Sequence, residues 1–240
     1  MTVLNEVETA SADRLYSVAG HDDLARARRD RAVTAVGGGG SVVLCDSVVA
    51  PRGGAIVYAA AAAQVGNTAF TIRHSSGFMQ VALPARRCDE LGLSAQCGAD
   101  HGDLAQCVTV DAAEGIGTGI SAADRATTAR LLAAPASTRE QFTRPGHLVP
   151  LRARPDLSPW DFGMAEAAVH LVSATGAPPA AVLADIVDPV DPRQMAHGQS
   201  LRTFAHTQGL PMIGLDDLAV CAPLVPTVDL EVRTETEPAG

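Results

Sequence analysis

Lysine is absent from the 240-residue chain, and all 18 of its Lys and Arg positions are arginine. Enzymes that hold a carbonyl substrate or pyridoxal phosphate through a Schiff base need a lysine amine, so both classes are excluded. A Walker-type phosphate-binding loop also requires a lysine, which excludes that class of nucleotide-binding protein. The missing residue type therefore removes several common kinds of site before any motif is considered.

Aromatic residues are scarce at 3% of the chain, whereas hydrophobic residues make up 47%. The core must therefore be built from alanine, valine and leucine, and the length is sufficient for one globular domain. Positive charge is also in short supply, because the formal net charge is −9. A protein that binds a phosphate backbone needs a surplus of basic side chains on one face, so we expect no nucleic-acid partner.

The five cysteines include no C-x-x-C pair and have no histidine at a zinc-ligand interval. We interpret them as reduced thiols, which favours a cytoplasmic location. No run of residues approaches the ~20 apolar positions that a membrane span requires. Membrane insertion and secretion are therefore not expected.

Strand-like and helix-like patterns alternate along the chain, which predicts an α/β or α+β fold with one mixed sheet flanked by helices. The expected domain covers residues 22–221, between an N-terminal segment (1–21) and a flexible tail (222–240). Helices are expected over residues 22–36, 60–73, 122–133, 159–175 and 200–208, with shorter ones from 84 and near 137–142. Strands are expected over residues 41–45, 55–59, 78–83, 105–111, 148–152, 180–187 and 211–215.

A glycine-rich turn precedes the helix expected at 122–133 and reads Glu114-Gly-Ile-Gly-Thr-Gly119. The spacing does not fit a dinucleotide fingerprint, since the third glycine is misplaced and no acidic residue follows at the usual distance. The turn and the helix N-terminus place several N–H groups together, which suits an anion. Thr118 is therefore a candidate substrate-binding residue.

Three segments together resemble 3,4-dihydroxy-2-butanone 4-phosphate synthase. They are the sequence TIRHSSG at residues 71–77, EGIGTGISAADR at 114–125, and RPGH at 144–147 with PLR at 150–152. The resemblance extends from about residue 22 to residue 220. It implies a homodimeric α/β fold with a pocket near the dimer interface. It also implies an enzyme that uses magnesium to convert ribulose 5-phosphate into a four-carbon phosphate and formate, for riboflavin synthesis.

The positions that would bind magnesium in this family carry other residue types here. The family's acidic Arg-Glu-Asn-Glu-Gly-Asp segment falls at residues 49–54, where Ala50, Arg52 and Gly54 replace its three acids. The remaining metal ligand, a histidine, corresponds to Met164, and the family's phosphate-binding arginine corresponds to Asp161. A thioether and an alanine cannot supply the oxygen ligands of Mg²⁺. We therefore expect no metal ligand and no cofactor.

Acid-base groups of the family are retained, which leads us to expect a catalytic role for His147 and Asp185. A histidine and a carboxylate near one substrate can transfer protons near neutral pH. His147 can equally be a structural histidine after a turn, and Asp185 can belong to a buried hydrogen-bond network. Trp160 can form a pocket wall or simply pack. The candidate substrate-binding residues are Arg52, Thr118, Trp160, Asp161, Met164 and Glu166.

These substitutions lead to the expectation of an enzyme repurposed for metal-independent lyase, enolisation or cyclisation chemistry in specialised metabolism. Its substrate is expected to be a small molecule other than ribulose 5-phosphate. Two alternatives remain open: a catalytically silent homologue that binds a ligand or partner, and an authentic riboflavin-pathway synthase. We expect a homodimer in each case.

Overall fold

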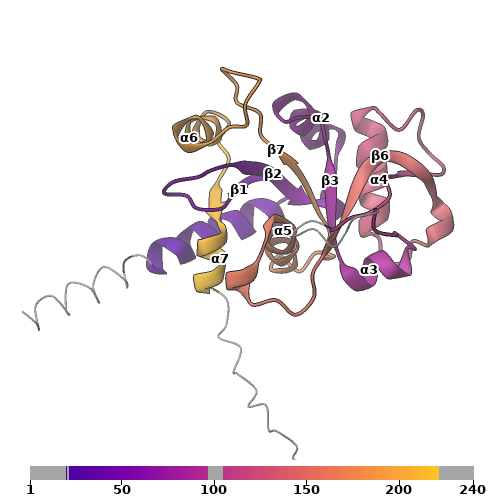
Figure 1. Ribbon diagram of the computed structural model, residues 1–240, viewed down its shortest axis with the longest axis horizontal. Helices are drawn as coiled ribbons and strands as arrows, with labels where there is room; N and C mark the ends of the chain where they lie inside the picture. Colours follow the sequence, from indigo (N-terminus) through magenta and orange to yellow (C-terminus); the bar gives the residue numbers. More distant parts are fainter. Residues whose placement is uncertain (1–19, 21, 97–104, 222–240) are drawn as a thin grey trace, which may run out of the picture.

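One mixed sheet forms the centre of the molecule in the computed structural model, which describes residue 20 and residues 22–96 and 105–221. The strand order is β4-β6-β3-β7-β2-β1-β8, and β5 pairs with β6 outside this path (Figure 1). The strands are β1 (Val42–Cys45), β2 (Gly54–Ala59), β3 (Gln80–Pro84), β4 (Ala105–Gln106), β5 (Val110–Ala112), β6 (Phe142–Ala153), β7 (Ala181–Asp185) and β8 (Met212–Gly214). The predicted fold class is therefore confirmed.

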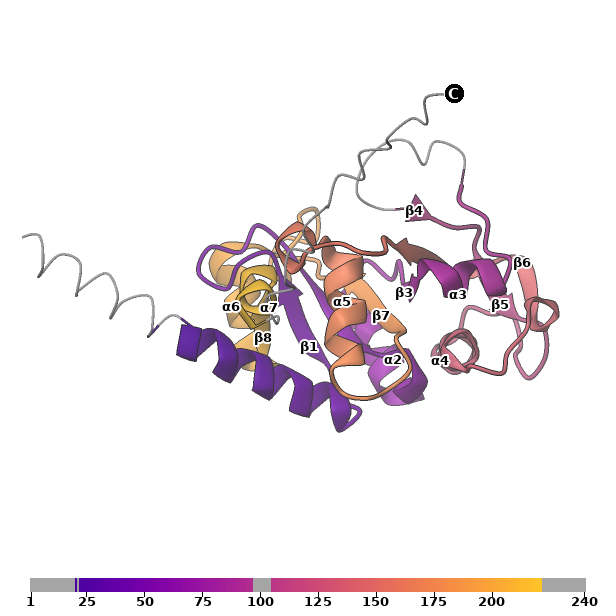
Figure 2. The same cartoon turned by 90° about the horizontal axis from the view of Figure 1, so that it is seen from below.

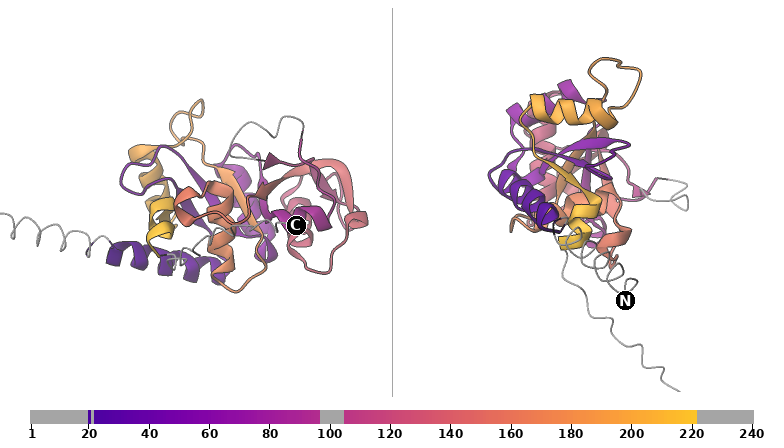
Figure 3. Two further views of the ribbon diagram at one scale, coloured as in Figure 1. Left: turned by 60° about the horizontal axis from the view of Figure 1, so that its bottom comes forward. Right: turned by 90° about the vertical axis from the view of Figure 1, so that its left-hand side faces the viewer.

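Helices cover both faces of the sheet and give a three-layer arrangement. The α-helices are a helix over residues 22–37, α2 (Val65–His74), α3 (Ala85–Glu90), α4 (Ala122–Ala133), α5 (Met164–Ser173), α6 (Gly198–Thr207) and α7 (Leu215–Cys221). Side chains of α2, α3, α4 and α6 belong to one apolar core, and those of the 22–37 helix, α5 and α7 to the other. The right-hand view of Figure 3 shows the sheet between α6 and the 22–37 helix.

Small aliphatic side chains dominate both cores, as the composition predicts. On the α5 side the buried residues are alanine, valine, leucine and isoleucine, and the few buried rings lie in the other core, where Tyr58 donates or accepts a hydrogen bond with Thr68 at 3.1 Å. Alanine faces let helices lie close to the sheet, because a methyl group adds little thickness to the interface. Figure 2 shows α5 lying directly against the strands.

Three expected elements are divided in the structure. The helix expected at 60–73 is a 3-10 turn (η1, Ala60–Ala62) followed by α2, because Asn67 Oδ1 accepts the N–H of Gln64 and starts a new helix there. The helix expected at 159–175 is likewise η3 (Pro159–Asp161) followed by α5. The strand expected at 105–111 is divided into β4 and β5. The expected helix near 137–142 is the 3-10 turn η2 (Arg139–Gln141).

The expected N-terminal segment, apart from residue 20, and the expected tail at 222–240 lie outside the described residues. Within the described part, α7 is an element that the sequence did not predict. No helix in that part is long and apolar enough to cross a bilayer.

Candidate functional site

One edge of the sheet gathers most of the predicted site. Gln80 of β3 is paired with Val149 of β6 on one side and with Leu183 of β7 on the other. His147 and Asp185 each lie two residues from these partners, so they reach the same level of the sheet, two strands apart. At a strand spacing of about 4.8 Å their backbones are separated by roughly 10 Å.

The strand partners of Gln80 lie on one face of the sheet, whereas β6 changes its register with β5 between Thr143 and Leu148, next to His147. Side chains two positions apart on a strand share a face, and Val149 and Leu183 pack in the same core as α5. The structure therefore brings the backbones of the two predicted catalytic residues to a common edge of the sheet.

His147 is held by Asp111, a residue that the sequence analysis did not select. One carboxylate oxygen of Asp111 accepts the backbone N–H of His147 at 3.0 Å, and the other lies 2.6 Å from Nδ1 of its ring. The Asp111 side chain is buried, whereas the His147 side chain is 38% exposed. A buried carboxylate thus anchors an accessible imidazole.

A sequence signal for Asp111 did exist. It stands at the end of the apolar stretch Val108-Thr-Val-Asp111, and an acidic residue in a buried strand is costly unless a partner satisfies it. The same argument was applied to Asp185, which had been selected by its resemblance to the family. The sequence did not predict that β5 pairs with β6. This pairing brings Asp111 to His147, which lies 36 positions further along the chain.

Asp185 ends β7 between β2 and β3, where Ala55 is its partner across the sheet. Its side chain is exposed at the surface, yet the neighbouring protein atoms remove part of its water and raise the pKa of the carboxyl above its usual range. A raised pKa keeps a carboxyl protonated to higher pH, which suits a proton donor. The environment of Asp185 therefore fits the predicted acid-base role.

The glycine-rich turn is already occupied by a side chain of the protein. Asp124 accepts the N–H groups of Gly117 and Gly119, both at 3.1 Å, and Ser121 caps α4 by accepting the N–H of Asp124. The expectation that this cluster of N–H groups binds an external anion is therefore wrong for these two donors. Thr118 is exposed between them, and its predicted contact with substrate stays a prediction.

Arg52 lies in the loop between β1 and β2 and closes that loop on itself. Its Nε is 2.6 Å from Oδ2 of Asp46, and its backbone N–H donates to the other oxygen of the same carboxylate at 2.9 Å. The end of this loop reaches Ala55, the neighbour of Asp185. Arg52 thus precedes the strand that pairs with β7, and its guanidinium already has an anionic partner.

Glu166 has a local role in the structure. Its buried carboxylate accepts the N–H of Gly163 at 2.9 Å and both the backbone N–H and Nε of Arg154, at 2.9 and 3.2 Å. These bonds cap α5 and tie it to the end of β6. Both carboxylate oxygens therefore have partners within the chain, which favours a structural role for Glu166.

Trp160, Asp161 and Met164 lie around the start of α5. Trp160 is 67% exposed in η3, and Met164 packs partly against the α5-side core. Among the hydrogen bonds and ion pairs of the described residues, none connects these three with His147 or Asp185. Their predicted substrate contacts stay predictions.

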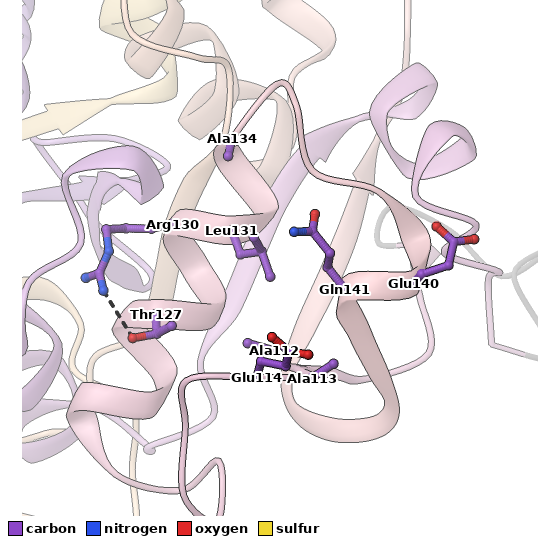
Figure 4. Close-up of a pocket in the computed structure, with 9 residues that line it drawn as sticks. All are labelled: Ala112, Ala113, Glu114, Thr127, Arg130, Leu131, Ala134, Glu140 and Gln141. Atoms are coloured by element: carbon purple, nitrogen blue, oxygen red, sulfur yellow. Dashed lines mark hydrogen bonds between the residues drawn. The ribbon is translucent and has the colours of Figure 1, made fainter.

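A pocket in the described part of the chain lies elsewhere. It measures about 610 Å³ between the end of β5, α4 and η2. Figure 4 shows the side chains of Leu131 and Gln141 facing this space from opposite walls. Neither His147 nor Asp185 lines it. This pocket and the two candidate acid-base residues therefore lie in different parts of the structure.

The fold and the site edge define a class of protein that has been solved before. The structure superposes on 3,4-dihydroxy-2-butanone 4-phosphate synthase of Candida albicans with a TM-score of 0.74 and 34% identity, over 79% of this chain and 94% of that one. It also superposes on a synthase in complex with two magnesium ions, with a TM-score of 0.69 and 32% identity, over 78% of this chain and 92% of that one.

The chain belongs to the 3,4-dihydroxy-2-butanone 4-phosphate synthase family, whose profile matches residues 30–220. Riboflavin biosynthesis proteins RibBA of Mycobacterium marinum and Mycobacterium tuberculosis are each 44% identical to it over 192 residues, or 79% of this chain. The alignment covers 45% of each relative, so the chain spans less than half the length of the curated relatives that it matches.

These relatives correct the expectation of a repurposed enzyme. A metal-independent enzyme of specialised metabolism, acting on a molecule other than ribulose 5-phosphate, was predicted from the altered acidic segment. The prediction was wrong, because the relatives at 44% identity are riboflavin biosynthesis proteins. The altered segment was given too much weight against the similarity of the remaining chain.

The described residues do not fit a magnesium site. Mg²⁺ requires oxygen ligands in near-octahedral geometry, and Ala50, Gly54 and Met164, which the resemblance placed at the ligand positions, have no side-chain oxygen. No group of three or more His, Cys, Asp or Glu side chains gathers at metal-binding range in residues 22–96 and 105–221. The groups that the described residues do supply for proton transfer are His147, with Asp111 against its ring, and Asp185.

Proposed function

We propose that the chain catalyses the synthase reaction of riboflavin biosynthesis, forming 3,4-dihydroxy-2-butanone 4-phosphate and formate from ribulose 5-phosphate. The observation that carries this proposal is the 44% identity over 192 residues with riboflavin biosynthesis proteins. A lyase-type reaction of this kind begins with removal of a proton next to a carbonyl. The acid-base groups at the site edge are suited to that step.

In this proposal His147 accepts the proton and Asp185 donates one. The ring of His147 is accessible and is anchored from behind by Asp111. Asp185 holds its proton to higher pH because desolvation raises the pKa of its carboxyl. The two residues lie on strands that flank β3, at one edge of the sheet.

We also propose that the enzyme acts as a homodimer in the cytoplasm on this small phosphorylated substrate. No disulfide joins the cysteines in the described part of the chain, which supports a reducing compartment. The net charge of −9 supports a small-molecule rather than a nucleic-acid partner. Light scattering on the purified chain tests the dimer.

The experiment that tests the function is a formate assay with ribulose 5-phosphate, run with added Mg²⁺ and with a chelator. We expect formate and the four-carbon phosphate to appear together, and His147→Gln to lose at least about 100-fold of the rate, the lower bound for a general base. Asp89→Asn, an exposed carboxylate paired with Arg152, is the control that keeps the rate. Absence of formate under both conditions contradicts the proposal.

A second candidate function is a ligand-binding homologue without turnover. The observation in its favour is the replacement of acids by Ala50, Arg52 and Gly54. Calorimetric titration with ribulose 5-phosphate distinguishes the two candidates. Binding without formate release supports the second candidate, and binding with formate release supports the first.

A further inference from the structure

The contact between Asp111 and His147 determines which ring nitrogen carries the proton. An ionised carboxylate only accepts hydrogen bonds, so with Asp111 ionised the donor is Nδ1 of His147, 2.6 Å from Oδ2 of Asp111. In the neutral ring the lone pair then resides on Nε2. The other oxygen of Asp111 accepts the backbone N–H of the same residue, which fixes the carboxylate relative to the ring.

Backbone from the glycine-rich turn covers this pair. Gly119 has a φ of +81°, and a Cβ built on it overlaps the Asp111 carboxylate and lies 2.6 Å from Nδ1 of His147. Only glycine therefore allows the turn to pass so close. The close backbone limits the access of water to the carboxylate, and lower hydration strengthens a charge-assisted hydrogen bond.

Asp124 holds the covering turn in place. Its two carboxylate oxygens accept the N–H groups of Gly117 and Gly119, and its own N–H is bonded to the helix cap Ser121. The glycine-rich turn and the strand β5 thereby both lie next to His147. The arrangement satisfies the buried Asp111, and it also fixes the orientation of the His147 ring. The His147 side chain nevertheless remains 38% exposed to solvent.

We propose that Asp111 is a positioning residue that fixes His147 as a proton acceptor through Nε2. The glycine-rich turn that covers the pair is held by hydrogen bonds to Asp124. The proposal rests on the proposed function for its consequence in turnover. Its structural part is independent of substrate. Asp111 orients and polarises the base, and His147 is the group that reaches the substrate.

The first test is the tautomer of His147, measured by long-range ¹H–¹⁵N NMR of the imidazole nitrogens, with His147→Gln used to assign the signals. We expect the wild-type neutral ring to be protonated on Nδ1. In Asp111→Asn the amide oxygen can keep the backbone N–H, while the amide NH₂ donates to Nδ1 and moves the proton to Nε2. A wild-type ring protonated on Nε2 overturns the proposal, even if the variant does not fold.

Asp217→Asn is the matched control. Asp217 is also a buried carboxylate, but it binds Arg28 and the N–H of Gly214 and does not contact His147. We expect this variant to lose stability and to keep the Nδ1 tautomer. A change of tautomer in both variants means that loosening of the fold moves the proton, which contradicts a specific role of Asp111.

The second test is kinetic. Asp111→Asn is expected to lower kcat for formate release by at least about 100-fold with KM changed by less than about 3-fold, since binding groups stay in place. An unchanged kcat in a folded variant with the switched tautomer overturns the positioning role. If the wild-type protein releases no formate, the proposed function is contradicted. The NMR measurement of the His147 tautomer then still decides whether Asp111 positions the ring.

Discussion

Asp185 illustrates at the scale of one residue how a functional group can oppose stability. Desolvation raises the pKa of its carboxyl, so ionisation costs more in the folded than in the unfolded chain. The cost grows as the pH rises through the folded pKa and is absent below about 3.9, the ordinary value. The folded protein therefore carries a penalty at neutral pH that an uncharged side chain avoids.

We expect Asp185→Asn to raise Tm by about 1–2 °C at pH 7.5, a small effect because the side chain is exposed and solvent screens it. The gain in Tm should fade as the pH falls toward 4. Formate release by the variant should be lower than that of the wild type. Thermal scans of wild type and variant across this pH range measure it. Higher stability with lower activity is the pattern of a group retained for function.

Asp188 is the matched control three residues away. Its hydrogen bonds, first that with Ser200 and then those from the N–H groups of Val190 and Asp191, lower the pKa of its carboxyl. Asp188→Asn should therefore lower Tm at neutral pH, with the loss fading as the pH falls through the lowered pKa. The same sign for both variants contradicts the assigned environments.

Sequence reasoning at this scale found the accessible members of the site and missed the buried one. His147 and Asp185 were recognised because their residue types and motif positions pointed to acid-base chemistry. Asp111 functions only through the pairing of β5 with β6, and nothing local to residue 111 shows which side chain it meets. The local partners of Glu166 and Asp124 were equally hidden, because they depend on how a loop folds back on a helix end.

At the scale of the elements, Glu166 connects the start of α5 with the end of β6 through Gly163 and Arg154. We expect Glu166→Ala to reduce the free energy of unfolding by about 3 kcal/mol, because it leaves the buried side of an ion pair and a helix N-terminus without a partner. Glu166→Gln should cost less, since an amide oxygen still accepts one N–H. Urea denaturation followed by circular dichroism measures both.

The outcome of that experiment also decides the earlier assignment of Glu166. Loss of stability with unchanged KM in Glu166→Gln indicates a structural residue. Unchanged stability with a raised KM instead supports the predicted contact with substrate.

Element types were well predicted and their boundaries were not. Helix 122–133 matches α4 because Ser121 is a strong N-cap, and its hydroxyl does accept the N–H of Asp124. The expected helices at 60–73 and 159–175 were too long, since Asn67 and Glu166 each start a new helix after a short 3-10 turn. Side-chain caps inside a run of alanines leave little trace in hydrophobic periodicity.

At the scale of the whole molecule, an ion pair joins two distant segments on the α5 face. Arg28 of the helix at 22–37 binds both oxygens of Asp217 in α7, and Asp217 is 1% exposed. The guanidinium of Arg28 is always charged, because arginine does not lose its proton at any relevant pH. The pair fastens the unpredicted last helix to the first described one.

We expect Arg28→Ala and Asp217→Ala each to reduce the free energy of unfolding by about 3 kcal/mol, as removing one partner leaves a buried group unsatisfied. The double variant should lose clearly less than the sum of the two, since the residues are in contact. Chemical denaturation of the four proteins completes the cycle. Simple additivity shows that the pair does not act as a unit.

The sheet order has a consequence for synthesis on the ribosome. β1 takes β8 as its parallel partner, with Val43 opposite Met212, so about 170 residues must follow β1 before that edge is filled. At about 5–20 residues per second the nascent chain carries one bare strand edge for roughly 10–35 s. During that interval β1 can pair with other emerging chains, and β8, the last strand of the described residues, ends this exposure.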